Sequence, residues 1–379
     1  MTLKQLATLI IMIAAAGGAI AQSSGSSAQN EAQNAVWDVP RAVYTQTNAA
    51  EGNEVLIYRR DSRGGIALSG KVKTRGLGTG AGLGSQGAMA LTPDGLRLYV
   101  VNAGSDTISA FAVTRRGLAL IDRVPSGGDQ PISLTLKHDL LYVLNAGSDN
   151  ISGFHIAWDG RLQPLRDSSR PLSGAAVQPA QVLFNNTGDF LVVTEKATNK
   201  IDLYDVADDL AKGPFVRDSK GMTPFGFAFD RRDRLVVSEA FGDTPGATAT
   251  SSYDFDAADA PLDVISGSVK SGQTSACWVA ITRNGRYAYV ANTGSGTITA
   301  YRVARNGEIA LRDTNGITTV TGTGSKPQDL ALSRKGVFLF ALTPGTGTLH
   351  SLRVNADGSL THVMKAQGVP ASAQGLAAY

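Results

Sequence analysis

Cysteine, histidine and charged residues are all scarce in this chain of 379 residues. Cys277 is the single cysteine, so no disulfide can form within the chain and the fold must rest on its hydrophobic core. The 4 histidines are not at metal-ligand spacing with one another or with Cys277, so the sequence gives no indication of a zinc site. We therefore expect neither a metal nor another cofactor.

Charged residues make up 18% of the chain, and the formal net charge is only +3. Lysines and arginines are scattered along the sequence, and no basic run is interleaved with aromatic residues. A basic patch of that kind is the usual footprint of a nucleic-acid-binding protein. We expect no nucleic-acid partner.

Long apolar runs are missing from most of the chain, and the N-terminus holds the exception. Lys4 supplies a positive charge, Leu6–Ile13 form a short apolar stretch, and Ala19-Ile20-Ala21 matches a cleavage site. This pattern predicts a secretory signal peptide over residues 1–21; the alternative, a membrane anchor, requires a longer apolar stretch. We expect export to the periplasm or the extracellular space, with no membrane attachment after cleavage. The small polar residues of 22–41 predict a flexible leader.

What the sequence does have is a repeat. Tyr99-Val-Val-Asn102-Ala-Gly-Ser returns as Tyr142-Val-Leu-Asn145-Ala-Gly-Ser and again, slightly altered, from Tyr289. A recurrence of strand formers and turn residues at a period of roughly 40–50 residues is typical of a β-propeller. The 43 glycines against 14 prolines, without a collagen-like period, fit a fold with many tight turns.

Each unit of the repeat reads as an alternating inner strand, an apolar second strand, an Asn-containing turn, a third strand and a weaker fourth. The second strands are predicted seven times, at Ala42–Tyr44, Leu98–Val101, Leu141–Leu144, Phe190–Val193, Leu235–Val237, Tyr287–Ala291 and Phe338–Leu342. The first unit lacks an inner strand, whereas the C-terminal segment from Gln374 has the inner-strand pattern and nothing after it. We therefore predict an all-β, seven-bladed propeller over residues 42–379, closed by the C-terminal strand joining blade one.

On these Tyr-Val-x-Asn repeats, residues 42–379 resemble the seven-bladed β-propeller lactonase family, which includes phosphogluconolactonase-like proteins and carboxymuconate cyclases. The resemblance implies hydrolysis of a lactone or a related cyclisation. Active members tend to carry a Pro-His-x-His segment and an Arg-His pair near inner strands. Here the corresponding segments begin Gln130-Pro-Ile-Ser and Gln178-Pro-Ala-Gln, while Glu195 matches the family's acidic position after the second strand of blade four.

In such a propeller, the turns after second strands and the connections into inner strands gather on one face around the central channel. Glu195 and Glu239 end the second strands of neighbouring blades, and we predict them as a catalytic pair in which one raised pKa serves acid/base chemistry. Lys196, Lys326 or amide side chains would stabilise the oxyanion. The residues predicted to bind substrate are Asn102, Asn145, Gln181, Trp278, Asn292, Lys326 and Gln328.

Each of these assignments has an alternative. The Asn and Glu residues at the ends of second strands are also suited to accepting or donating hydrogen bonds within the following turn. Residues 241–252 form either a lid or a surface insertion. Gly76–Gly84 joins two blades rather than a strand to a helix, which excludes a nucleotide-binding fingerprint.

For the whole chain, two functions remain open. One is a monomeric enzyme acting on a small-molecule lactone or another ligand of the channel. The other is a non-catalytic propeller outside the cytoplasm that serves as a binding platform for a ligand or a partner protein.

Overall fold

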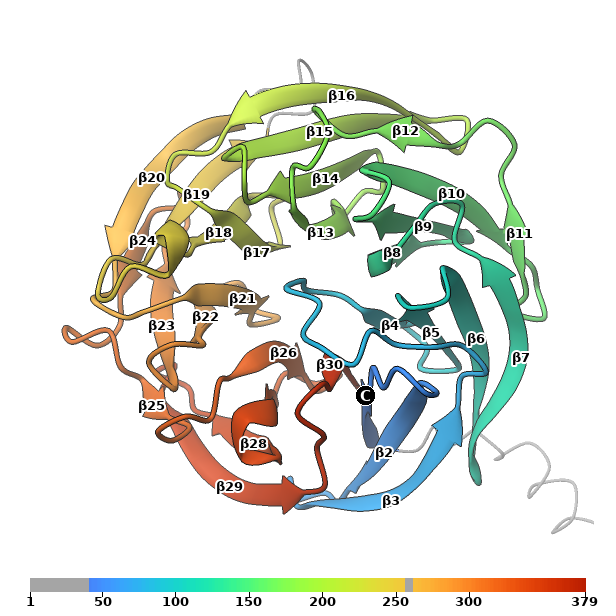
Figure 1. The fold of residues 1–379 in the computed structure, drawn as a ribbon. Helices are drawn as coiled ribbons and strands as arrows, with labels where there is room; N and C mark the ends of the chain where they lie inside the picture. Colours follow the sequence, from blue (N-terminus) through green and yellow to red (C-terminus); the bar gives the residue numbers. More distant parts are fainter. Residues whose placement is uncertain (1–40, 256–261) are drawn as a thin grey trace, which may run out of the picture. The chain divides into compact units, whose positions relative to one another are not determined.

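The computed structural model describes residues 41–255 and 262–379, and these form seven antiparallel sheets arranged in a ring. The predicted seven-bladed, all-β propeller is confirmed (Figure 1). The predicted signal peptide and nearly all of the predicted leader lie outside the described residues. Within the described ranges, no helix is long and apolar enough to cross a membrane.

Blade one is closed by the two ends of the described chain. Its sheet has the order β30-β1-β2-β3, and β30 pairs with β1 through Val43 opposite Ala378 and Tyr44 opposite Ala377. The bounds are β1 (Ala42–Gln46), β2 (Glu54–Arg60), β3 (Ile66–Lys73) and β30 (Gln374–Ala378). The predicted closure is therefore confirmed, and it leaves no unpaired edge between the first and last blades.

Blades two to four follow in chain order, each from the centre of the ring outward. Blade two contains β4 (Met89–Leu91), β5 (Arg97–Asn102), β6 (Thr107–Thr114) and β7 (Gly117–Pro125). Blade three contains β8 (Pro131–Lys137), β9 (Leu140–Asn145), β10 (Asn150–Ile156), β11 (Leu162–Pro164) and β12 (Arg170–Pro171), the last also pairing with β10. Blade four contains β13 (Pro179–Phe184), β14 (Phe190–Glu195), β15 (Lys200–Ala207) and β16 (Leu210–Asp218).

Blades five to seven complete the ring. Blade five contains β17 (Pro224–Phe229), β18 (Leu235–Glu239), β19 (Ala249–Phe255) and β20 (Leu262–Lys270). Blade six contains β21 (Ala276–Ile281), β22 (Tyr287–Asn292), β23 (Thr297–Val303), β24 (Ile309–Leu311) and β25 (Thr319–Val320). Blade seven contains β26 (Gln328–Leu332), β27 (Phe338–Thr343), β28 (Thr348–Val354) and β29 (Leu360–Gln367).

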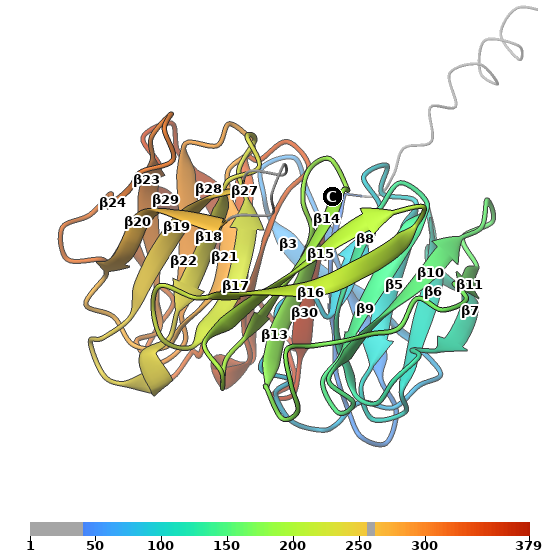
Figure 2. The same ribbon diagram turned by 90° about the horizontal axis from the view of Figure 1, so that it is seen from above.

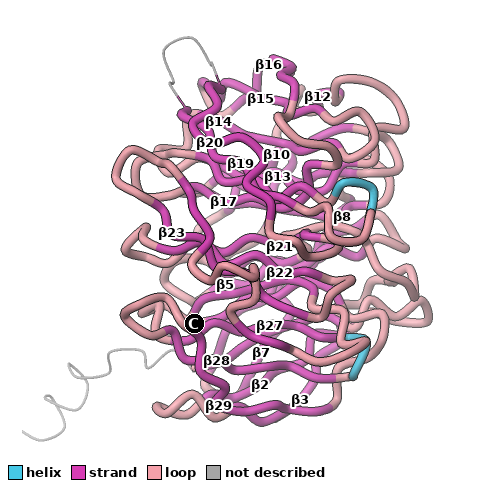
Figure 3. Tube along the Cα trace, turned by 90° about the vertical axis from the view of Figure 1, so that its left-hand side faces the viewer, coloured by secondary structure: helices cyan, strands magenta, loops and turns pink. Residues whose placement is uncertain are grey.

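Helix is confined, in the described residues, to two single 3₁₀ turns, η1 (Phe241–Asp243) and η2 (Pro344–Thr346) (Figure 3). In the side view of Figure 2, the strands run across the thickness of the ring, so their connections gather at two faces. We call the face that receives the ends of the second strands the channel face, and the other the opposite face.

The repeated tyrosine explains part of the repeat itself. Tyr99, Tyr142 and Tyr289 are fully buried, and each hydroxyl donates to a backbone carbonyl of the next blade. The distances are 3.1 Å from Tyr99 to Gly160 and 2.9 Å from Tyr142 to Asp209. The aromatic rings fill the space between blades, and each buried hydroxyl has a hydrogen-bond partner on the neighbouring blade.

Candidate functional site

The glycine-rich connection between β3 and β4 enters the centre of the ring (Figure 1). Gln86, at the end of this connection, reaches across to blade six: its amide Nε2 donates to the Val279 carbonyl at 2.8 Å, and its Oε1 accepts from the Val279 N–H at 3.0 Å. The backbone N–H of Gln86 also donates to the Ala180 carbonyl of blade four at 3.0 Å. We call residues 76–87 the channel loop, because it joins inner strands from different parts of the ring.

Two side chains that the sequence assigned to substrate, Trp278 and Gln181, form hydrogen bonds with the protein backbone around the channel. The Trp278 indole N–H donates to the Ser85 carbonyl at 2.9 Å, and the buried Trp278 ring packs against Phe225. Gln181 clamps the neighbouring inner strand, donating to the Phe227 carbonyl at 3.1 Å and accepting from its N–H at 2.7 Å. These side chains hold the ring together around the loop.

Two further residues assigned to substrate lie at the start of blade seven. Gln328 accepts a hydrogen bond from the Gln374 amide at 2.6 Å, which links blade seven to the closing strand. Lys326 is exposed. Lys326, which precedes β26, is therefore more open to solvent than the half-buried Gln328.

The three asparagines assigned to substrate are fully buried and engage their own turns. Asn102 Nδ2 donates to Thr107 Oγ1 at 3.1 Å and to Ser109 Oγ at 2.9 Å. Asn292 makes the equivalent pair of bonds with Thr297 and Thr299, and Asn145 donates to Ser152. This geometry matches the turn-capping interpretation, since the amides point along the third strand of their own blade.

Blade four replaces this Asn–Ser pairing with two carboxyl groups. Glu195 ends β14 and Asp202 lies on β15, and both are fully buried. The Ser173 N–H donates to Glu195 Oε1 and to Asp202 Oδ2, each at 3.0 Å. Glu195 Oε2 also accepts from the Ser173 hydroxyl at 2.6 Å and from the Thr198 hydroxyl at 2.5 Å.

Burial, together with the hydrogen bond and the charge of Glu195, raises the pKa of Asp202 to about 8. Near neutral pH, Asp202 is therefore largely protonated and can donate a proton. Ser173 itself is exposed, so the pair lies directly beneath a solvent-facing residue. A carboxyl pair that holds a proton near pH 7 is the kind of group that general acid/base catalysis requires.

Glu239, the predicted partner of Glu195, makes its hydrogen bonds elsewhere. It is buried in blade five, where it accepts from the hydroxyls of Ser251 and Ser268, the latter at 2.8 Å. Burial raises the pKa of Glu239, and Glu195 is not among the causes. No hydrogen bond joins Glu195 to Glu239 in the described part of the chain, because each side chain turns into its own blade. The carboxyl partner of Glu195 is Asp202.

Residues 51–177 and 237–372 match the profile of the family described as "Lactonase, 7-bladed beta-propeller". The chain belongs to this family. The match covers more than half of the chain and includes blades on both sides of blade four. No curated protein sequence matches this lactonase-family propeller at significant similarity.

Solved structures share the fold of this lactonase-family propeller. A putative 6-phosphogluconolactonase from Bacteroides fragilis is 18% identical with a TM-score of 0.68, covering 90% of this chain and 99% of the other. A protein from Lactobacillus plantarum is 17% identical with a TM-score of 0.73, covering 89% and 98%. The periplasmic gluconolactonase of Pseudomonas aeruginosa is 17% identical with a TM-score of 0.67, covering 88% and 98%. At these identities the likeness establishes the fold.

Lys196 follows Glu195 and brings a cation to the channel loop of the lactonase-family propeller. Its ammonium donates to the Gly84 carbonyl at 2.5 Å and lies 4.9 Å from the centre of the Phe225 ring. Burial lowers the pKa of Lys196 to about 8. Cys277 lies nearby and is buried, which raises the pKa of its thiol to about 12 and keeps it unreactive.

Sequence reasoning missed Asp202 and Ser173. A signal for Asp202 was present, because aligning the repeats places it where Ser109 and Ser152 stand in blades two and three. Ser173 had no such signal, since it belongs to an irregular connection. In the predicted loop over residues 241–252, residues 249–252 belong to β19. The part before β19 contacts the β20–β21 connection, with Gly246 N–H donating to Thr274 Oγ1 at 3.1 Å.

Proposed function

We propose that this chain is an exported, monomeric enzyme that hydrolyses a small-molecule lactone at the channel face, with Glu195 and Asp202 as the proton-transferring pair. The observation that carries the proposal is their shared hydrogen bond to Ser173, with Asp202 protonated near neutral pH. Membership of the lactonase family and the fold shared with a periplasmic gluconolactonase support the substrate class and the compartment.

The proposed reaction uses Glu195 as the proton acceptor and Asp202 as the proton donor. The oxygen of a water molecule attacks the lactone carbonyl carbon, and Glu195 accepts the proton that the water loses. When the ring carbon–oxygen bond breaks, protonated Asp202 donates to the leaving alkoxide, and the product is the open hydroxy acid. The proton on Glu195 then passes to Asp202 and restores the starting state. The ammonium group of Lys196 is held by the Gly84 carbonyl of the channel loop. Once the loop releases it, its positive charge stabilises the oxyanion.

Acid release in a pH-stat assay on a panel of neutral and anionic lactones tests the proposal. Glu195→Gln and Asp202→Asn are each expected to lower kcat/KM by roughly 10²–10⁴-fold, the range for loss of general acid/base catalysis. Glu239→Gln is the matched control, because Glu239 occupies the same position one blade later, and it is expected to keep activity. Thermal melting of each variant checks the fold. Absence of acid release by the wild-type protein from every lactone would overturn the proposal.

A second function has its own support in the channel loop. Gln86, Ser85 and Gly84 take up the polar groups around the channel, as expected of a rigid ring that binds partners through its surface rather than a substrate in its centre. On this alternative the chain is a non-catalytic binding platform. The wild type then hydrolyses no lactone, and Glu195→Gln changes only the stability of the fold.

A further inference from the structure

A cleft on the opposite face lies between blades five and six, at the strand ends away from Glu195. Its larger cavity, about 800 Å³, is lined by the β17–β18, β21–β22 and β23–β24 turns. A second cavity of about 510 Å³ adjoins it along the outer strands and shares Arg286, Val303 and Ala304. We call the two together the arginine cleft.

The larger cavity is lined by four arginines whose charge is not neutralised. Among the described residues, none of them forms an ion pair with a carboxylate: Arg231, Arg232, Arg286 and Arg305. The single carboxylate in the lining, Asp230, is already bound to the buried Arg234, whose Nε lies 2.8 Å from it. The cavity therefore has a strongly positive lining, although the whole chain carries a net charge of only +3.

The same Asp230–Arg234 pair makes the wall of the cleft rigid. Asp230 Oδ1 accepts from the backbone N–H of Arg232 at 2.7 Å, which fixes the blade-five turn. Arg234 Nη1 donates to the Arg305 carbonyl at 2.7 Å and so ties that turn to the β23–β24 turn of blade six. The backbones that carry Arg232 and Arg305 are thus held in place before any ligand arrives, which lowers the entropic cost of binding.

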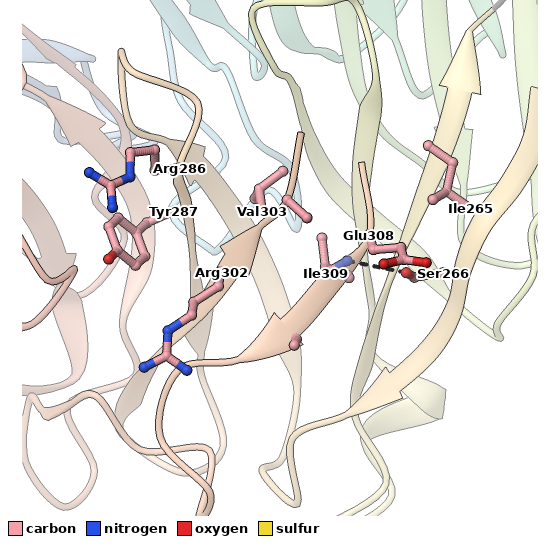
Figure 4. Close-up of a pocket in the computed structure, with 10 residues that line it drawn as sticks. Ile265, Ser266, Arg286, Tyr287, Arg302, Val303, Glu308 and Ile309 are labelled. Carbon is pink, nitrogen blue, oxygen red and sulfur yellow. Dashed lines mark hydrogen bonds between the residues drawn. The ribbon is translucent and has the colours of Figure 1, made fainter. Parts of the chain in front are cut away.

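The second cavity is less uniformly basic. Figure 4 shows Arg286, Tyr287 and Arg302 on one side of it and Glu308 with Ser266 on the other. The Ile309 N–H donates to Ser266 Oγ at 3.1 Å, leaving the Glu308 carboxylate exposed at the far side. An anionic group is therefore favoured in the larger cavity, while the second cavity suits a neutral or hydroxylated part of the same ligand.

We propose that the arginine cleft binds a small polyanion that carries two or more phosphate or carboxylate groups. Guanidinium groups present forked donors that match both kinds of group, and such bidentate bonds are among the stronger hydrogen bonds in proteins. A cavity of about 800 Å³ is within the range of small-molecule sites. The cleft is separate from the channel face, so this inference stands whether or not the chain hydrolyses lactones.

Calorimetric titration tests the proposal with two probes, inorganic tripolyphosphate for phosphate groups and citrate for carboxylates. The test variant is the double substitution Arg231→Gln/Arg305→Gln, which leaves the buried Arg234 in place. The matched control is Arg115→Gln/Arg116→Gln, which removes two exposed arginines from the β6–β7 turn of blade two.

We expect saturable binding of at least one probe, weakened 10-fold or more in the test variant and unchanged in the control. The probe that binds more tightly identifies the preferred anionic group. Equal weakening in the two variants would mean general charge attraction and would overturn the proposal, as would the absence of saturable binding by either probe. Thermal melting confirms that the test variant is folded, and its lactone hydrolysis is expected to equal that of the wild type.

Discussion

Glu195 and Asp202, on adjacent strands of blade four, accept hydrogen bonds from the same Ser173 N–H at 3.0 Å each. The equivalent positions of blade two hold Asn102 and Ser109, a neutral pair that needs no proton to be buried. Two carboxyl groups at this position differ from the Asn–Ser pair, because two negative charges so close together in a buried space repel each other. Blade four thus keeps the geometry of the repeat but adds a carboxyl group, that of Asp202, whose raised pKa lets it hold a proton near neutral pH.

The first prediction concerns the pH dependence of stability. The pKa of Asp202 is raised to about 8 in the folded protein from an ordinary value of 3.8, so between these values the folded state binds more protons than the unfolded state. The contribution of Asp202 to the free energy of unfolding then falls as the pH rises through this window, at up to about 1.4 kcal/mol per pH unit for one proton.

Asp202→Asn removes this titration and is expected to flatten the pH dependence. Urea unfolding of both proteins at intervals from pH 4 to pH 9 measures the difference. Parallel curves for the wild type and the variant would show that Asp202 does not hold the proton.

The channel loop depends on the absence of a side chain at Gly226. A Cβ there would lie 2.1 Å from Gln86 Oε1 and 2.5 Å from the Cys277 carbonyl, so either the loop or the inner strand must move. We expect Gly226→Ala to lower stability by about 1–3 kcal/mol and to increase hydrogen exchange over residues 76–87. Gly70→Ala is the control, since a Cβ at Gly70 meets nothing within 4 Å. Unchanged exchange in the loop would contradict this account of Gly226.

The tie between blades two and three is tested by Tyr99→Phe. The substitution keeps the ring but leaves the buried Gly160 carbonyl without its donor, at a cost of about 1–3 kcal/mol in unfolding free energy. Tyr287→Phe is the matched control, since no hydrogen bond to the Tyr287 hydroxyl is found within the described ranges. Denaturant unfolding of both variants gives the comparison, and equal losses would argue against an energetic role for the Tyr99 hydroxyl.

Cys277 provides a probe of the closed ring. Its thiol is buried beside Trp278, and burial raises its pKa to about 12, so almost no thiolate is present at pH 8. We expect no reaction with Ellman's reagent in the native protein and one full equivalent in urea. Rapid labelling of the native protein would mean that the inner strand of blade six opens.

The repeat could be predicted because its information is local. Tyr99, Asn102 and their counterparts recur at a constant spacing, alternation marks the strands, and glycines mark the turns. The ring closure followed from the same pattern. Blade one lacked an inner strand, and the C-terminal segment from Gln374 had the pattern of an inner strand with no further strands after it.

The candidate site could be predicted only in part from the sequence. Glu195 was identified from its position in the repeat, yet its partner was assigned to the next blade rather than to the adjacent strand. Asp202 belongs to the same local register, but its importance comes from complete burial, which raises its pKa and which the sequence does not display.

The sequence by itself determined the blades, their number and the closure of the ring, because these depend on short-range periodicity. Only the tertiary structure decided what fills the centre and which charges meet at the surface. Gln86 pairs with Val279, 193 residues away, from a glycine-rich segment with no periodic signal. Arg231, Arg286 and Arg305 are scattered in the sequence and line one cavity because neighbouring blades bring their turns together. Such contacts depend on ring closure, and no local pattern encodes them.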